Sequence, residues 1–418
     1  MKANDYFRDV NHTLFAQMNY ILFDDETRLS LLPFTFTRPV AEIRIGILTI
    51  KEKWERFLKT NVSFFTEEFL ATKFPLNIEK DNTLINGSVI PDAALVKEIS
   101  RLKKGEKITI KNPSGEGAFL LAWRIAGDEL KALKSLHNTD AEGAVTNAAI
   151  FKITNTWDIF SMNDKALKQD FELITKGKKS KRISKTNRLI NEDDIFIEEG
   201  AKVECSTLNA TEGPIYIGKN AEVMEDVCIR GPFSLGEGAV VRMGAKIYGA
   251  TTIGPHCRVG GEVHNSVLIG YSNKAHDGFL GDSVIGEWCN LGADTNNSNL
   301  KNNYSQIRIW SFRDEAYINT GLQFCGLMMG DHSKCSINTM FNTGTMVGIS
   351  ANIFGTGFPP KIVPSFSWGG SEGFKTYRLQ EATEVAQRVF ERRKKPFDET
   401  EQKIMKYLFD MSTKYRAW

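Results

Sequence analysis

Histidine and cysteine are the residue types in this chain that could do acid–base, metal or redox chemistry, and there are six of each. The cysteines lie far apart with no Cys-x-x-Cys pair, so neither a zinc site nor a disulfide framework is indicated, and we expect them to be reduced and mostly buried. The sequence has no Gly-x-Ser-x-Gly elbow and no Walker loop. Four of the histidines have no metal-ligand spacing: His12, His137, His256 and His264.

The remaining two histidines lie in the second half of the chain, which has a period of six residues. Every sixth residue from Ile217 onward is aliphatic for eight positions in succession: Ile217, Val223, Ile229, Leu235, Val241, Ile247, Ile253 and Val259. Many are followed directly by glycine, and often by a small residue four positions on. This period is typical of a parallel β-helix, in which each hexapeptide forms one face of a prism and three form a coil. The aliphatic side chains are predicted to point inward, with the small residues at the corners.

The repeat is interrupted in two places, and the interruptions predict loops. The phase slips after Val259 and is lost from residue 296 to residue 318. It resumes first at Phe279, Ile285 and Leu291, and then at Met329, Cys335, Phe341, Val347 and Ile353. Loops that leave a rigid solenoid are where binding and catalysis are usually placed. His276 lies in the first interruption, whereas His332 falls at a regular turn and is expected to be structural.

Length and patterning predict several domains. A chain of 418 residues is long enough for two or three. Residues 18–175 alternate apolar runs with amphipathic stretches, as in an α/β domain. Residues 191–370 carry the repeat, and residues 371–418 have helical spacing, as a helix pair that closes the solenoid or as a partner-binding tail. Residues 1–17 are expected to be a flexible leader, and the basic run in 176–190 a linker, with phosphate binding as the alternative.

The composition is that of an ordinary soluble protein. There are 53 basic and 51 acidic residues, giving a net charge of +2, which provides no nucleic-acid footprint. No apolar run is long enough to span a membrane. The N-terminal segment lacks the features of a signal peptide, so we expect a cytoplasmic protein.

A hexapeptide β-helix behind a smaller α/β domain resembles the bifunctional N-acetylglucosamine-1-phosphate uridyltransferase / glucosamine-1-phosphate acetyltransferase family, and most closely its bacterial branch of sugar nucleotidyltransferase-like proteins. The resemblance covers the chain from Met18 onward. It implies an α/β nucleotidyltransferase-like domain, a left-handed β-helix and C-terminal helices. It also implies a homotrimer in which acetyltransferase clefts form between neighbouring prisms.

The most specific match is the segment from Lys274 to Asp282, KAHDGFLGD, followed by SVIGEWCNLGADT. It is similar to the family's K-x-x-H-x-x-Y-x-G-D and I-G-x-x-x-N-x-G-A-G-T. The resemblance implies that His276 is the general base, that Asn290 and Lys274 bind the acceptor sugar, and that acetyl-CoA is the acyl donor. A neutral imidazole, with an unperturbed pKa of about 6.5, suits removal of a proton from an attacking amine. Because the segment is one residue short and has Phe279 at the tyrosine position, the acceptor could differ.

The N-terminal match is to the family's nucleotidyltransferase signature, L-x-x-G-x-G-T-R-x-x-P-L-T-x-x-x-P-K. Here the stretch FDDET replaces the glycines that let backbone N–H groups approach nucleotide phosphates. Carboxylates at Asp24 and Asp25 would repel a triphosphate unless Mg²⁺ bridges them. Arg28 and Arg38 are the expected phosphate contacts.

The sequence therefore predicts a transferase of nucleotide-sugar metabolism that acts on a small sugar phosphate or nucleotide sugar. Acyl transfer from acetyl-CoA to an amino-sugar phosphate is favoured over nucleotidyl transfer. The alternative is a catalytically inactive homologue that binds a sugar nucleotide or has a regulatory role.

Overall fold

The computed structural model describes residues 18–111, 118–133, 136, 143–146 and 148–416. The predicted leader, His12 and His137 lie outside these residues. The chain divides into two compact units by its contacts. The N-terminal unit comprises the residues up to Leu31 together with Arg38–Ile43 and Leu48–Thr154, and the solenoid unit comprises Leu32–Thr37, Arg44–Ile47 and Asn155–Trp418.

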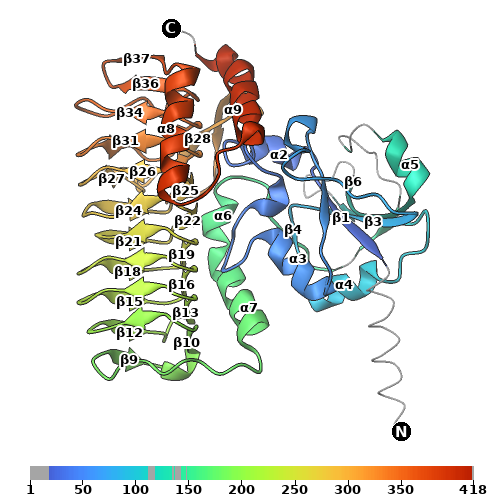
Figure 1. The fold of residues 1–418 in the computed structure, drawn as a ribbon, viewed down its shortest axis with the longest axis horizontal. Coiled ribbons are helices and arrows are strands. Elements are labelled where there is room, and N and C mark those ends of the chain that lie inside the picture. Colours follow the sequence, from blue (N-terminus) through green and yellow to red (C-terminus); the bar gives the residue numbers. More distant parts are fainter. Residues whose placement is uncertain (1–17, 112–117, 134–135, 137–142, 147, 417–418) are drawn as a thin grey trace. The chain divides into compact units, whose positions relative to one another are not determined.

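The N-terminal unit is built on a six-stranded mixed sheet with the order β2-β1-β3-β6-β5-β7 (Figure 1). The strands are β1 (Asn19–Phe23), β2 (Ser63–Phe65), β3 (Asp81–Asn86), β5 (Lys107–Lys111), β6 (Ala118–Ala126) and β7 (Ala144–Val145). Strand β1 is parallel to β2 and β3, whereas β3 and β6 are antiparallel. Strands β4 (Val89–Ile90) and β8 (Phe151–Lys152) form a separate pair. Side chains such as Ile21, Phe23 and Leu84 form a core cluster of the unit.

Two helices of this unit begin at polar caps. Helix α3 (Ile50–Leu58) starts at a capping box, in which Thr49 accepts from the Glu52 N–H and Glu52 accepts from the Thr49 N–H. Helix α4 (Ala93–Ile99) is capped by the Asp92 carboxylate. The remaining helices are α2 (Thr27–Ser30), α5 (Gly127–Ala132), η1 (Val40–Glu42) and η2 (Glu68–Leu70).

The solenoid unit is a parallel β-helix whose coils stack regularly in Figure 1. Its three faces are here called sheets A, B and C. Sheet A contains β10 (Ile195–Ile197), β13 (Ile215–Ile217), β16 (Phe233–Leu235), β19 (Thr251–Ile253), β22 (Val267–Gly270), β25 (Val284–Glu287), β30 (Leu327–Met329), β33 (Thr345–Val347) and β35 (Ile362–Val363). Sheet B contains β11 (Lys202–Val203), β14 (Glu222–Val223), β17 (Val240–Val241), β20 (Arg258–Val259), β23 (Asn273–Lys274), β26 (Asn290–Leu291), β31 (Lys334–Cys335), β34 (Asn352–Ile353), β36 (Ser367–Gly370) and β37 (Gly373–Thr376). Sheet C contains β9 (Arg188–Ile190), β12 (Thr207–Asn209), β15 (Cys228–Arg230), β18 (Lys246–Tyr248), β21 (Glu262–His264) and β24 (Phe279–Gly281), and the pair β27 (Asn296–Asn297) and β32 (Met340–Phe341) follows it.

The aliphatic positions of the repeat form one continuous core. All eight residues from Ile217 to Val259 in the predicted phase are buried in it, as are the five from Met329 to Ile353. Cys257 is buried at a corner and Cys335 points inward, as predicted, and all six cysteines are free. One position in the middle segment is wrong. Leu280 is the inward residue, whereas Phe279 is half-buried, because the phase slips by a residue that the six-residue count did not register.

Other elements of the solenoid unit pack along the prism. Helices α6 (Asp158–Ser161) and α7 (Asn163–Thr175) belong to it, so the contact division falls at Asn155 rather than at the expected boundary of residue 175. Within the expected linker, Lys181 N–H donates to the Ile197 carbonyl, so the linker pairs with the first coil from Lys181 onward. The predicted second loop contains a hairpin of β28 (Arg308–Ser311) and β29 (Ala316–Asn319).

The last described elements are α8 (Leu379–Arg392), α9 (Glu399–Met411) and η4 (Ser412–Tyr415), and Figure 1 shows α8 running along the solenoid. Phe390 of α8 stacks on Trp288 of the solenoid. The predicted architecture is confirmed: an α/β domain, a parallel β-helix and C-terminal helices. No helix in the described part of the chain is long and apolar enough to cross a membrane.

Candidate functional site

A cleft of about 560 Å³ opens where the chain passes from sheet B to sheet C. It is lined by Arg242, Met243, Gly260, Gly261, Ala275, His276, Asp277, Ala293 and Asp294. These residues belong to successive coils, so the rigid stacking of the solenoid fixes the walls. Of the residues predicted to act, the cleft contains His276.

The cleft exists because small residues flank His276 along the corner. Four residues connect β17 to β18, β23 to β24 and β26 to β27, but only Gly260 and Gly261 connect β20 to β21. The second residue of each connection is Met243, Gly261, His276 and Ala293 in turn. His276 therefore lies between the two smallest side chains of this column. Its imidazole is exposed in a notch rather than packed between neighbouring side chains.

Both glycines of the short connection are required by the close approach of the next coil. A Cβ on Gly260 would lie 2.6 Å from the Ala275 carbonyl oxygen. Gly261 has a φ of +70°, and a Cβ there would lie 2.8 Å from the Cα of Asp277. The loop that carries His276 therefore rests directly on the glycine turn.

The charges around the cleft are mixed. Two carboxylates, those of Asp277 and Asp294, line the cleft together with the imidazole. Arg242 lines it from two coils before the one that carries His276. The Asp294 carboxylate accepts from Asn296 Nδ2 at 3.3 Å, and its backbone N–H donates to the Asp277 carbonyl at 3.1 Å. An imidazole that can take a proton, next to carboxylates that attract a cation, suits an amine nucleophile.

Lys274 does not face the cleft. Its side chain points into the solenoid and is only 2% exposed. The ammonium donates to the carbonyls of Gly260 at 3.0 Å and His276 at 2.6 Å. Burial lowers the pKa of this lysine to about 8, and the nearby Asp277 and Asp294 carboxylates oppose the shift.

Asn290 is exposed on the outer face of sheet B, in register with Asn273. The Asn273 amide donates to Asn290 Oδ1 at 3.5 Å, and Arg393 of the C-terminal segment donates to Asn273 Oδ1 at 3.3 Å. Asn290 is absent from the described residues that line the cleft. The structure thus brings Asn290 and His276 onto neighbouring coils but does not join them in one pocket.

His332 lies at the opposite kind of corner, between sheets A and B. It has a positive φ of 63° and stacks with Trp288 and with Phe390 of α8, at ring separations of 6.4 and 5.9 Å. Trp288 stacks in turn on Tyr271 at 4.2 Å. His332 is therefore part of the aromatic ladder on which α8 packs.

In the N-terminal unit, the Asp24 carboxylate is occupied by the protein itself. It accepts from the Val40 N–H at 2.9 Å and from Thr66 Oγ1 at 2.6 Å, and Arg28 Nε lies 3.7 Å away. Burial raises the pKa of Asp24 to about 6, although these partners favour the charged form.

Asp25 is held in the same way at the start of α2. Its carboxylate accepts from the Thr27 N–H at 2.9 Å and from Asn86 Nδ2 at 2.7 Å, and Lys152 Nζ lies 3.4 Å away. Burial acts against the charged form, but Lys152 and the hydrogen bonds outweigh it, so the pKa of Asp25 is lowered. Both carboxylates thus complete hydrogen-bond networks of the fold.

Arg28 and Arg38 are also buried in the N-terminal unit. The Arg28 guanidinium lies 3.9 Å from Glu67 and packs over the Phe69 ring. Among the described residues, no group of three or more histidine, cysteine, aspartate or glutamate side chains is arranged to hold a metal ion. In the signature region, protein donors thus hold the oxygens of Asp24 and Asp25, and both arginines are buried.

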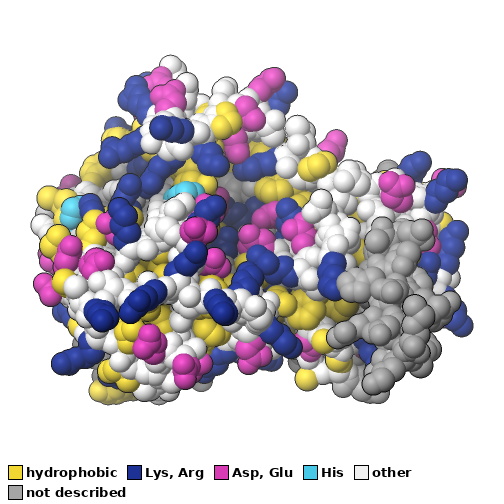
Figure 2. All heavy atoms as spheres, turned by 60° about the horizontal axis from the view of Figure 1, so that its bottom comes forward, with side chains coloured by type: hydrophobic (Ala, Val, Ile, Leu, Met, Phe, Trp, Pro, Cys, Tyr) yellow, Lys and Arg dark blue, Asp and Glu magenta, His cyan; other side chains and the backbone are white. Residues whose placement is uncertain are grey.

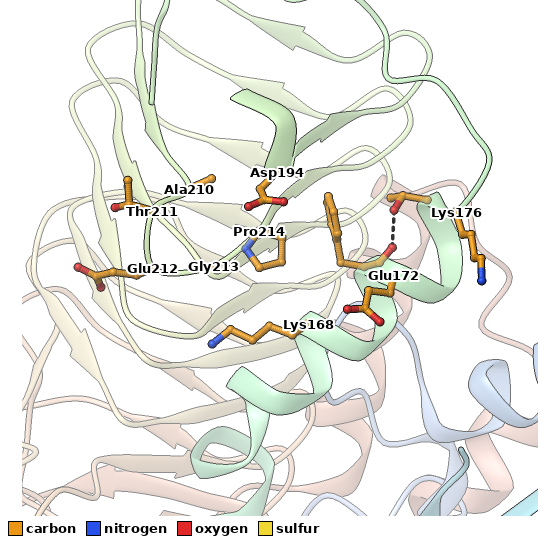
Figure 3. Close-up of a pocket in the computed structure, with 11 residues that line it drawn as sticks. Lys168, Glu172, Lys176, Asp194, Ala210, Thr211, Glu212, Gly213 and Pro214 are labelled. Carbon is orange, nitrogen blue, oxygen red and sulfur yellow. Dashed lines mark hydrogen bonds between the residues drawn. The ribbon is translucent and has the colours of Figure 1, made fainter. Parts of the chain in front are cut away.

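A larger groove of about 670 Å³ lies between α7 and the corner that follows β12 (Figure 3). Lys168, Glu172 and Lys176 come from the helix side, and Asp194 and Glu212 from the solenoid. Its charges alternate in sign, and its described lining contains neither histidine nor cysteine. On the face shown in Figure 2, acidic side chains likewise lie among the basic ones. The described lining of the groove therefore provides no nucleophile or general base of the cysteine or histidine type.

Two signals of this site were present in the sequence. The pair Gly260-Gly261 coincides with the phase slip, and a shortened corner is what leaves room beside His276. The inward position of Lys274 could have been found by counting strand positions from Val259, with which it pairs in register. Arg242, Asp277 and Asp294 were not singled out, although a spacing of about one coil separates Asp277 from Asp294.

Comparisons with known proteins support the resemblance. Residues 20–179 match the model of the sugar nucleotidyl transferase family. A bifunctional GlmU protein of Cyanothece sp. is 23% identical over 224 residues, covering 46% of this chain and 49% of that protein. A bifunctional sugar-1-phosphate nucleotidylyltransferase/acetyltransferase of Sulfurisphaera tokodaii is 31% identical over 114 residues, covering 27% of each. The chain thus spans about half the length of the first of these relatives and less of the second.

A solved structure of an Arabidopsis UDP-N-acetylglucosamine acyltransferase aligns with 53% of this chain and 80% of its own, at a TM-score of 0.23 and 16% identity. That similarity is too weak to indicate a shared function. The family match and the GlmU relatives thus support the resemblance found in the sequence.

Proposed function

We propose that this GlmU-like protein transfers an acyl group from acetyl-CoA to the amine of a sugar phosphate, in the cleft around His276. The observation that carries the proposal is the exposed imidazole in a notch made by Gly261 and Ala293. The alignment of Lys274–Asp282 with the acetyltransferase segment of the bifunctional family supports it.

The transfer needs one proton carrier. His276 removes a proton from the acceptor amine as its nitrogen attacks the thioester carbonyl, and a C–N bond forms. Collapse of the tetrahedral adduct breaks the C–S bond, and the imidazolium returns the proton to the leaving thiolate. Asp277 and Asp294 attract the acceptor in its cationic form and bring its nitrogen next to His276. The ammonium first releases one proton to solvent, which frees the lone pair, and His276 then takes the second proton as the neutral amine attacks.

The acceptor is proposed as an amino-sugar phosphate because one relative is named a sugar-1-phosphate nucleotidylyltransferase/acetyltransferase. We propose that Asn290, exposed one coil above Asn273, contributes to acceptor binding from the outer face of sheet B. The cytoplasmic location inferred from the sequence stays a prediction.

We further propose that the protein is a homotrimer whose clefts are completed by a neighbouring prism. Met243, at the cleft, and Ile337, on the same corner further along, are 66% and 65% exposed. Apolar side chains so exposed beside a cleft favour burial against another surface. A second copy of the solenoid is the partner that the resemblance implies.

A second function is proposed for the N-terminal unit: binding of a sugar phosphate or nucleotide sugar without nucleotidyl transfer. Asp24 and Asp25 replace a glycine cradle, and their oxygens are held by Val40, Thr66 and Asn86. This is the observation that favours the predicted alternative, a binding or regulatory role, for this part of the chain.

The experiment that tests the proposed activity incubates the full chain with acetyl-CoA and glucosamine 1-phosphate, and follows free thiol and acetylated product by mass spectrometry. Glucose 1-phosphate, which lacks the amine, is the matched control substrate. Acetylation of the amino sugar alone is expected. Absence of product with a panel of amino-sugar phosphates, together with stabilisation by nucleotide sugars, would support the binding role instead.

A further inference from the structure

The inward column of sheet B contains a charged residue next to a run of valines. Val203, Val223, Val241 and Val259 pair in register along successive coils, and the next residue in this register is Lys274. The four valines belong to the continuous apolar core. A lysine at this position places an ammonium group in surroundings that in the preceding coils hold aliphatic side chains.

The ammonium of Lys274 makes two specific hydrogen bonds. It lies at the corner between sheets B and C and donates to two carbonyls, one on each side of the cleft. The Gly260 carbonyl belongs to the glycine turn that floors the cleft, and the His276 carbonyl to the loop that carries the imidazole. The side chain therefore ties the His276 loop to the turn beneath it.

The backbone fixes the two ends of this loop. The backbone N–H of Gly260 donates to the Lys274 carbonyl at 2.8 Å, and that of Glu262 to the Gly278 carbonyl at 3.2 Å, so both ends are held by the coil below. Between these points, the His276 carbonyl is the group that the ammonium holds. The charge of the ammonium strengthens that hydrogen bond.

We propose that Lys274 is a positioning residue, which holds the loop of residues 275–278 against the Gly260-Gly261 turn and thereby fixes His276 in the cleft. This inference rests on the proposed acyl transfer for its functional consequence, but the structural tie does not depend on that activity. It also replaces the expectation that Lys274 contacts substrate, since its ammonium is turned away from the cleft.

A purely stabilising role predicts a different outcome. Replacing a buried charge by an apolar side chain of similar volume is often neutral or stabilising. Met fills nearly the same space as Lys and matches the apolar column. If Lys274 positions His276, Lys274→Met should leave the unfolding temperature equal or higher, while the loop loosens.

Lys334 offers a matched control. It also lies in sheet B, and its ammonium donates to the carbonyl of a histidine two residues away, His332, at 2.8 Å. Burial lowers the pKa of Lys334 to about 8 as well. Its histidine belongs to the aromatic ladder and not to the cleft. Lys334 is half-buried and in register with Asn290 rather than in the inward column, so Lys334→Met removes an ammonium that holds a histidine carbonyl without touching the His276 loop.

The test compares amide hydrogen exchange and turnover in Lys274→Met, Lys334→Met and the unchanged protein. In Lys274→Met, exchange in a peptide covering residues 275–278 should rise at least about tenfold, and kcat should fall by as much as about 100-fold with KM for acetyl-CoA little changed. The fold-decrease in kcat caused by His276→Ala should be smaller in the Lys274→Met background than in the unchanged protein. Lys334→Met should leave that peptide and kcat unchanged.

Several results would overturn the inference. Unchanged exchange in residues 275–278 would show that the ammonium does not hold the loop. Unfolding of both Lys274→Met and Lys274→Val, the latter restoring the residue of the neighbouring coils, would show a structural role. If the unchanged protein transfers no acyl group but the loop still loosens in Lys274→Met, the proposed function fails and the positioning role stands.

Discussion

Asp24→Asn should make the N-terminal unit more stable at neutral pH, although it removes a buried charge that has an arginine nearby. The oxygen of the introduced amide would still accept from the Val40 N–H, and its nitrogen could donate to Thr66 Oγ1. Burial raises the pKa of Asp24 from 3.8 to about 6. The folded state therefore binds a proton more tightly than the unfolded state does.

The size and sign of the effect follow from that shift. A rise of about 2 pKa units corresponds to about 3 kcal/mol at about 1.36 kcal/mol per unit. Because the folded pKa is the higher one, the contribution of Asp24 to stability is fully present below about pH 4 and is lost as pH rises through about 6. The amide of the variant carries no charge at either pH. We expect the variant to be more stable by up to about 3 kcal/mol near neutral pH, with the difference vanishing near pH 4.

Urea unfolding at the two pH values measures the free-energy difference, and hydrogen exchange in peptides of β1 and β3 assigns it to the N-terminal unit. The titrations are repeated with Mg²⁺. A variant less stable than the unchanged protein near neutral pH would refute the reasoning. So would stabilisation of the unchanged protein by Mg²⁺ that Asp24→Asn abolishes, because it would identify the carboxylate as a metal ligand.

Three further predictions follow from the same geometry. Pyrophosphate release from sugar 1-phosphate and the four common nucleoside triphosphates with Mg²⁺ should be absent or far below about 1 per second, because Asp24 and Glu26 stand where a glycine cradle is needed; turnover in the usual enzymatic range would contradict this. Light scattering should report about three times the chain mass of 47.0 kDa, and a monomer at micromolar concentration would exclude a cleft shared between subunits. Because the pKa of Lys274 is lowered, its contribution to stability is present above pH 10.5 and is lost as pH falls through about 8. The unchanged protein should therefore gain stability relative to Lys274→Met as pH rises over this range. A difference in urea unfolding that stays constant with pH would show that the pKa of Lys274 is not lowered.

Much of the solenoid could be predicted because its signal is repeated. The aliphatic residues from Ile217 to Val259 each meet the same requirement, burial in one continuous core, so a single period accounts for all of them. The period fails where a corner loses residues. The two-residue connection at Gly260-Gly261 breaks the phase after Val259. Later, Leu280 and Ile285 are only five residues apart, so a count of six back from Ile285 assigned Phe279 inward instead of Leu280.

The roles of the charged residues were harder to predict, because the residue type indicated a substrate contact while the position in the fold indicated a structural role. A lysine in a matching motif is typical of a substrate contact, but the register with Val259 turns Lys274 into the core. The spacing of Asp24 and Asp25 indicates groups facing phosphate, and the donors that occupy them, Thr66 and Asn86, lie far away in the sequence. Helices α6 and α7 have apolar faces that do not specify whether a sheet or a prism covers them.

The most direct test of the central claim is the rate of acetyl-CoA-dependent amine acetylation in His276→Ala. Loss of a general base typically costs about 100- to 10,000-fold, so we predict a fall within that range with the oligomeric state unchanged. His332→Ala, which alters the aromatic ladder under α8, should retain the rate. An unchanged rate in His276→Ala would contradict the account, because it would place the proton transfer outside the cleft between Gly261 and Ala293.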